Sequence, residues 1–173
     1  MNYAFRNGKI LDGTKEMKIQ QGLCILVENG IITDLIPDAN ADLHNYKVID
    51  LHGQYILPGL INMHVHLAGN GKPQKKQRDN EKLVKTIMSS SLTRTIAYKM
   101  VAGFGVTTIR TVGGLGNFDT RLRDEIESGT KLGPRILAAN HGISVPGGHM
   151  AGSVAVAAST IPDALKQLEK AKQ

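Results

Sequence analysis

The chain is poor in cysteine, and this excludes disulfide cross-links within it. It has 173 residues and a single cysteine, Cys24, so no internal disulfide can form. Cys24 lies in the apolar run Gly22–Val27. Reactive cysteines need an electropositive and accessible setting, whereas a free cysteine in an apolar run behaves as a small hydrophobic residue. We therefore predict that Cys24 is a buried core residue.

Long apolar runs are also missing. No window reaches the roughly 18 uninterrupted apolar residues of a membrane span, and the N-terminal residues Met-Asn-Tyr-Ala-Phe-Arg lack the apolar centre of a signal peptide. Hydrophobic residues make up 41% and charged residues 21% of the chain, as in globular proteins that bury a core. We expect a cytoplasmic protein with no membrane partner.

Negative charge is scarce, with 15 acidic residues against 21 Lys and Arg and a net charge of +6. Such an excess can indicate an acidic partner such as nucleic acid. Much of it, however, lies in a stretch rich in Gly, Pro and Gln that contains Lys72, Lys75, Lys76 and Arg78. No aromatic residue interleaves these charges to stack on bases. We interpret the stretch as a solvated loop and expect no nucleic-acid partner; a steep salt dependence of DNA affinity would contradict this.

Residues 1–57 consist of short apolar runs separated by turn signals. Asn29-Gly30, a dipeptide favoured in tight hairpin turns, stands between two of these runs and predicts a β-hairpin. Two further short strands are predicted on either side of His52-Gly53. The four predicted strands cover residues 23–28, 31–36, 48–51 and 54–57. The region is therefore predicted to be a small all-β unit.

From Pro58 onward, strand-like and helix-like stretches alternate. Apolar residues recur at four-residue steps from Val84 to Met100, which predicts a helix, and Thr160-Ile-Pro-Asp163 resembles a capping box at the start of another. In order, the predicted elements are a strand at 60–67, a helix at 80–102, a strand at 106–112, a helix at 118–128, a strand at 134–139 and a helix from 160 to the C-terminus. This alternation predicts parallel strands joined by crossover helices.

The feature with the most chemical content is Pro58-Gly-Leu-Ile-Asn-Met-His-Val-His-Leu, in which His64 and His66 (the histidine pair) are two residues apart. Side chains at i and i+2 of a strand lie on the same face. Two imidazoles on one face can bind one metal ion, and zinc suits imidazole nitrogens. The alternative is two ordinary histidines that pack or hydrogen-bond, although polar groups on an apolar strand are costly without partners. Spacing alone leaves both interpretations open.

The sequence around the histidine pair resembles the amidohydrolase superfamily. Residues 48–67 are similar to the place where an N-terminal β-sandwich segment leads through Pro-Gly into a first barrel strand ending in His-x-His. Gly-Phe-Gly-Val-Thr-Thr-Ile-Arg-Thr-Val-Gly-Gly, at 103–114, is similar to the second barrel strand. Gly-Pro-Arg-Ile-Leu-Ala-Ala, at 133–139, and Pro-Gly-Gly-His, at 146–149, resemble the third strand and its loop in the branch related to imidazolonepropionases and prolidase-like dipeptidases.

This resemblance implies an α/β fold in which a small β-sandwich segment, residues 1–57, precedes the first three βα units of a TIM (β/α)8 barrel, residues 58–173. Three units cannot close such a barrel, which needs roughly 250 residues, since 116 remain after Leu57 (173 − 57). We therefore expect a truncated chain that is inactive alone.

The resemblance also implies a chemistry. The histidine pair would bind one or two divalent metal ions, with zinc expected, at the C-terminal mouth of the barrel. The metal would lower the pKa of a bound water and polarise the carbonyl of an amide or related C–N bond. A small-molecule amide, cyclic amide or dipeptide-like compound would be hydrolysed. The catalytic residue is unknown, because the family's Asp, like its carboxylated Lys and later histidines, has no counterpart here.

Two ligands are fewer than the three that catalytic zinc sites usually have. His141 and His149 follow the third predicted strand and would share a rim with the histidine pair, whereas His44 and His52 belong to the β unit. The resemblance places the histidine of the Gly-Gly-His loop near the substrate. His149 is therefore the predicted substrate contact; the alternative is a loop histidine held by the backbone.

Two other interpretations concern partners and phosphate. An open parallel sheet exposes an edge strand and apolar faces, so the chain could instead be a non-catalytic fragment or subunit that completes its barrel with another chain. We therefore expect an oligomer or a complementing chain.

Gly113-Gly-Leu-Gly116 invites a phosphate-loop interpretation. Asp119 stands where the third glycine of that pattern would be, so we interpret this segment as a loop above the second strand.

Overall fold

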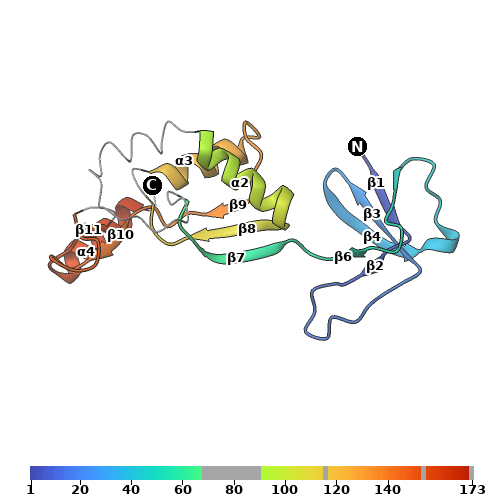
Figure 1. Ribbon diagram of the computed structural model, residues 1–173, viewed down its shortest axis with the longest axis horizontal. Helices are drawn as coiled ribbons and strands as arrows, with labels where there is room; N and C mark the ends of the chain where they lie inside the picture. Colours follow the sequence, from blue (N-terminus) through green and yellow to red (C-terminus); the bar gives the residue numbers. More distant parts are fainter. Residues whose placement is uncertain (68–90, 115–116, 153–154, 172–173) are drawn as a thin grey trace. The chain divides into compact units, whose positions relative to one another are not determined.

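A computed structural model of the protein describes residues 1–67, 91–114, 117–152 and 155–171 (Figure 1). The chain divides into two compact units, Met1–Pro58 and Gly59–Gln173. The basic stretch 72–78 and the first part of the predicted helix, 80–90, lie outside the described residues. None of the helices in the described segments is long and apolar enough to cross a membrane.

The first unit is built on a four-stranded sheet with the strand order β4-β3-β1-β5. β3 (Leu23–Glu28) pairs antiparallel with β4 (Ile31–Pro37) and with β1 (Tyr3–Arg6). β1 also pairs in parallel with β5 (Lys47–Asp50). A separate parallel pair joins β2 (Lys9–Ile10) to β6 (Tyr55–Ile56), and a short 3-10 helix, η1, covers Asp38–Asn40.

The turn between β3 and β4 confirms the hairpin predicted from Asn29-Gly30. Asn29 has φ 51° and Gly30 has φ 80°, and a two-residue turn with both φ values positive matches the right-handed twist of the strands it joins. Asn adopts this left-handed region more readily than most residues, and Gly does so without steric cost. The hairpin therefore follows from two residues of local sequence.

The core of the first unit forms on one face of its sheet. Ala4, Cys24 and Leu26 are buried there. Ile36 and three residues of the segment 41–46 pack against them: Ala41, Leu43 and Tyr46. The Cys24 side chain is fully buried, which confirms its predicted place in the core. Burial raises the pKa of its thiol.

The second unit contains a parallel sheet with the strand order β7-β8-β9. Its strands are β7 (Leu60–Val65), β8 (Val106–Thr111) and β9 (Arg135–Leu137), and both pairings are parallel. The helices α2 (Ser91–Phe104) and α3 (Phe118–Glu127) lie on the same side of this sheet (Figure 1). The α/β fold class and the parallel strands predicted for this region are confirmed.

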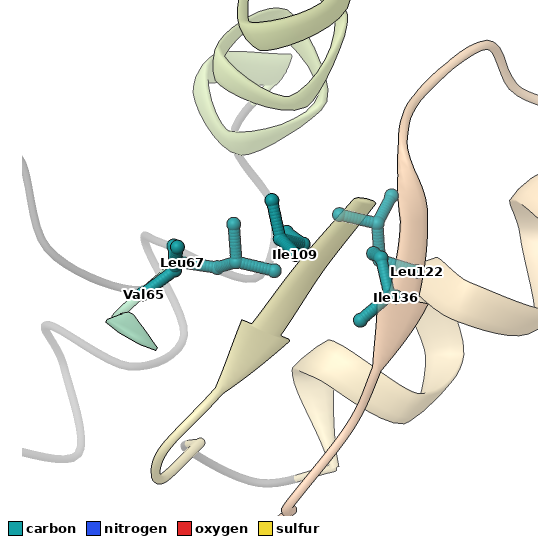
Figure 2. Packing of buried hydrophobic residues seen from close by; sticks show 5 residues of the cluster. All are labelled: Val65, Leu67, Ile109, Leu122 and Ile136. Atoms are coloured by element: carbon teal, nitrogen blue, oxygen red, sulfur yellow. The ribbon is translucent and has the colours of Figure 1, made fainter. Parts of the chain in front are cut away.

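One apolar cluster holds the helices to the sheet. Figure 2 shows its five buried members, which come from all three strands, from the residues after β7 and from α3: Val65, Leu67, Ile109, Leu122 and Ile136. Of the apolar stripe predicted for the first helix, Met100 falls where side chains are described, and it packs against this cluster. Strand side chains alternate between faces. The residues next to Val65, Ile109 and Ile136 on their strands therefore point to the other face of the sheet.

The chain after β9 differs from the prediction. A parallel pair of three-residue strands, β10 (Gly142–Ser144) and β11 (Ala155–Ala157), precedes the helix α4 (Ile161–Ala171). Strands this short carry no periodicity that a sequence pattern can reveal. The start of α4 is as expected, since the Asp163 N–H donates to Thr160 Oγ1 over 3.2 Å, the bond that a capping threonine makes.

Candidate functional site

The histidine pair lies at the C-terminal end of β7. His64 is in the strand and His66 follows its last residue, Val65. Their imidazole rings are arranged edge to face, with centroids 5.2 Å apart and planes at 74°. Both histidines are exposed, while Val65 between them is buried in the cluster under the helices. The two imidazoles therefore share the face of the sheet that points away from this cluster.

The donor set of the histidine pair fits part of a metal site. Zinc binds imidazole nitrogens at about 2.0–2.1 Å, and two rings on one tetrahedral ion then have centroids about 5 Å apart, close to the separation found here. Among the described residues, neither imidazole has a hydrogen-bond or ion-pair partner. No other side chain in the described segments therefore competes with a ligand for their ring nitrogens.

A third ligand does not join the histidine pair in the described segments. There, no group of three or more His, Cys, Asp or Glu side chains is arranged to hold a metal ion. The described residues therefore supply two donors, and a catalytic zinc site usually has three.

The ends of β8 and β9 carry a buried polar cluster made of Thr111, Asp119 and Asn140 (the strand-end cluster). All three are buried, with exposed fractions of 0%, 1% and 6%. The Thr111 hydroxyl donates to Asp119 Oδ2 over 2.6 Å, and the Asn140 N–H donates to the same oxygen over 3.0 Å. Asp119 lies in the first turn of α3, where the helix dipole favours a negative charge.

Sequence reasoning missed the strand-end cluster. Asp119 entered only as the residue that breaks a phosphate-loop pattern, and Thr111 only as part of a strand. An acidic residue in the first turn of a helix is common, so nothing in the local pattern marks Asp119 as buried. Part of the glycine-rich loop itself, residues 115–116, lies outside the described residues.

The other histidines divide between the two units. His141 is half-buried directly after Asn140, and His149 is exposed in the turn that follows β10. Among the described residues, neither of them forms a metal-holding group with the histidine pair. His44 and His52 lie in the first unit beside carboxylates, at 2.5 Å from Asp42 and 3.4 Å from Asp50.

Comparison with known proteins places these features in a family. A model of the amidohydrolase family matches residues 55–172. A curated dihydroorotase from Syntrophobacter fumaroxidans is similar at 38% identity over 78 residues, which is 43% of this chain and 17% of that protein. The chain therefore matches about a sixth of the length of this relative.

Two solved structures are similar over almost the whole chain. A Bifidobacterium longum protein provisionally assigned as a prolidase has 30% identity and a TM-score of 0.73, covering 98% of this chain and 38% of its own. A Xaa-Pro dipeptidase with methionine bound in its active site has 26% identity and a TM-score of 0.73, covering 99% of this chain and 44% of its own. This chain thus spans less than half the length of either protein.

Proposed function

The chain belongs to the amidohydrolase family, and from this premise we propose that it takes part in metal-dependent hydrolysis of C–N bonds. The geometry of the histidine pair is the observation that carries the proposal: two exposed imidazoles share one face, 5.2 Å apart. His64 and His66 would hold one divalent ion, with zinc the best match to imidazole donors. Such an ion, when bound, supplies a water of lowered pKa and polarises the carbonyl under attack.

The position of the pair in the fold supports this role. We interpret β7, β8 and β9 with their helices as the first three βα units of a TIM barrel, residues 58–173, preceded by a β-sandwich segment, residues 1–57. In such barrels the active site lies at the C-terminal ends of the strands, and the histidine pair lies at that end of β7. His64 and His66 are then part of a larger ligand set.

The substrate class is proposed from the relatives. Those matched include a dihydroorotase and a Xaa-Pro dipeptidase, so we propose a small molecule with a cyclic amide or a dipeptide-like amide. His149 is proposed as a substrate contact. Its exposure in the turn after β10, where the Gly148 N–H donates to the Val145 carbonyl over 2.9 Å, leaves its imidazole accessible.

A second candidate function is that of a partner-binding subunit. In the described sheet, β7 and β9 each pair on one side only. Leu60, Ile61 and Met63 on β7 expose 52%, 63% and 52% of their surface. Parallel sheets are normally covered on both faces, so these features favour a second chain that completes the sheet. A chain of this kind would sediment as an oligomer or bind a complementing polypeptide, with or without metal.

The metal content of the purified chain tests the first proposal. After equilibration with zinc and removal of free ion, we expect the wild type to retain zinc in an amount comparable to the protein. A His64→Ala/His66→Ala variant should retain almost none. His44→Ala/His52→Ala is the matched control, since it removes two exposed histidines from the first unit and should keep the zinc of the wild type.

The result that would end the proposal is equal zinc in the wild type and the His64→Ala/His66→Ala variant. Loss of zinc in the His44→Ala/His52→Ala control would instead place the metal in the first unit. Circular dichroism of all three proteins shows whether each is folded when its metal is measured.

A further inference from the structure

The carboxylate of Asp119 lies in the interior, and no cation from the described part of the chain is placed against it. Only 1% of the surface of Asp119 is exposed. Among the described residues, its carboxylate forms no ion pair. Three donors approach it instead: the Thr111 hydroxyl and the Asn140 N–H at Oδ2, and the Thr120 N–H at Oδ1 over 3.0 Å. Burying a carboxylate is costly even when it is hydrogen-bonded. A position that needs only packing would be filled better by an apolar residue.

The strand-end cluster forms hydrogen bonds just beyond the last backbone pairing of β8 with β9. Backbone pairing of β8 with β9 ends at Arg110 and Leu137. Beyond it, the Ala139 N–H donates to Thr111 Oγ1 over 3.0 Å, and the next N–H, that of Asn140, donates to Asp119. Two side chains thus replace the backbone acceptors of a continuing strand. They keep the residues after β9 beside the end of β8.

The turn at Asn140 is fixed from its other side as well. The Gly114 N–H donates to the Asn140 carbonyl, so both backbone groups of Asn140 are bound. Asn140 has φ 61°. This is a left-handed conformation, which Asn adopts more readily than most residues. Its side-chain Oδ1 is buried without a partner among the described residues. Unsatisfied buried groups are rare and often accompany functional sites.

Thr111 also lies beside the strand that carries the histidine pair. Thr111 is the ladder partner of Val65 in the pairing of β7 with β8. The next residue, Val112, donates its N–H to the Val65 carbonyl over 3.2 Å. Val65 is the residue between His64 and His66, so the end of β8 that Asp119 holds is the end against which the histidine pair is aligned.

We propose that Asp119 is a positioning residue for the metal site. Through Thr111 it fixes the strand ends that carry His64 and His66, and through Asn140 it holds the His141 turn on the same rim. This inference rests on the proposed function, because it assigns Asp119 a role in metal binding at the histidine pair. Partners that hydrogen-bond to metal ligands typically change metal affinity by about 10- to 100-fold when altered, and Asp119, which acts through the strand ends, is expected at the lower end of that range.

The test is a Co²⁺ titration of the whole chain, followed by visible absorption. Co²⁺ takes the same ligands as Zn²⁺ and absorbs visible light with an intensity that depends on its coordination geometry. Thr111→Val removes the hydroxyl with little change in shape, and Thr111→Ser retains it. We expect Thr111→Val to weaken Co²⁺ binding by about tenfold and to change the absorption band. Thr111→Ser should keep the affinity and the band of the wild type.

The controls separate the inference from the function on which it rests. Absence of Co²⁺ absorption in the wild type, or its persistence in His64→Ala/His66→Ala, would overturn the proposed function and this inference with it. Normal Co²⁺ binding by a folded Thr111→Val variant would overturn the inference alone, as would equal losses in Thr111→Val and Thr111→Ser. If Thr111→Val does not fold, Asp119→Asn, which retains the side-chain shape and one acceptor oxygen, is titrated in its place under the same criteria.

Discussion

The Thr111 hydroxyl donates a 2.6 Å hydrogen bond to the carboxylate of Asp119 in a place where both side chains are withdrawn from solvent. The same hydroxyl oxygen accepts the Ala139 N–H over 3.0 Å. One side chain therefore satisfies a buried acceptor and a main-chain donor 28 residues away. Its contribution to stability can be measured apart from any role in metal binding.

Removing this hydroxyl is expected to destabilise the second unit. Thr111→Val leaves the Ala139 N–H without an acceptor and takes a donor from Asp119, and each lost partner of a buried polar group costs about 1–3 kcal/mol. Thr111→Ser should cost less, because it retains both bonds. Chemical denaturation of the three proteins gives their free energies of unfolding. Equal free energies of unfolding for Thr111→Val and the wild type would show that the hydroxyl contributes nothing to stability.

A side chain at Gly59 should disrupt the start of β7. A Cβ atom there would lie 2.6 Å from the Cβ of Thr107, well inside van der Waals contact. We expect Gly59→Ala to lower the free energy of unfolding by about 1–3 kcal/mol, as overpacking generally does. Thermal unfolding followed by circular dichroism measures the change.

Gly103→Ala is the matched control for this substitution. A Cβ at Gly103 would meet no atom within 4 Å, and Gly103 lies within α2. Alanine is favoured over glycine in helices by up to about 1 kcal/mol, so Gly103→Ala should leave stability unchanged or raise it. A similar loss in both variants would mean that the contact between Gly59 and Thr107 is not the cause.

The Cys24 thiol should resist modification in the folded protein. It is fully buried, and burial, together with the negative charge of Asp38, raises its pKa. The thiolate is the reactive species, so both effects slow its reaction with a disulfide reagent. We expect fast labelling only in denaturant, measured by the release of the chromophore. Rapid labelling at pH 7 without denaturant would show that the core of the first unit opens readily.

Acid should weaken the first unit through Asp50. The His52 N–H, at 2.7 Å, and then the Asn7 side-chain amide, at 3.0 Å, hold the pKa of this carboxyl below its usual range. A carboxyl whose pKa is lower in the folded state stabilises the fold above its unfolded value of about 3.9. This stabilisation is lost as the pH falls through the folded pKa.

The measurement for this prediction is the free energy of unfolding between pH 6 and pH 3, compared between wild type and Asp50→Asn. We expect a shallower pH dependence in the variant. Some slope should remain, because hydrogen bonds from Thr14 and His44 also lower the pKa values of Asp12 and Asp42. Superimposable curves would exclude Asp50 as a source of the acid sensitivity.

Features that depend only on neighbouring residues could be predicted from the amino-acid sequence. Asn29-Gly30 specifies a hairpin because its two backbone conformations are local properties. The spacing of His64 and His66 places both on one face because strand side chains alternate with a period of two. The alternation of strand and helix patterns predicted a parallel sheet because crossover connections allow few other arrangements. The C-terminal ends of α2 and α3 were predicted to within two residues for the same local reasons.

Which polar residues are buried, and which segments they connect, depends on how distant parts of the chain pack together. Asp119 meets Asn140, 21 residues later, and Thr111 meets Ala139, and no local pattern specifies either contact. The β10–β11 pair also depends on contacts between distant segments. His64 and His66 lie on the exposed face of the sheet because Val65, between them, is buried beneath α2 and α3. This burial required the sheet and the helices to assemble. Burial is a property of the packed chain, because the atoms that exclude water from a side chain come from all parts of the sequence.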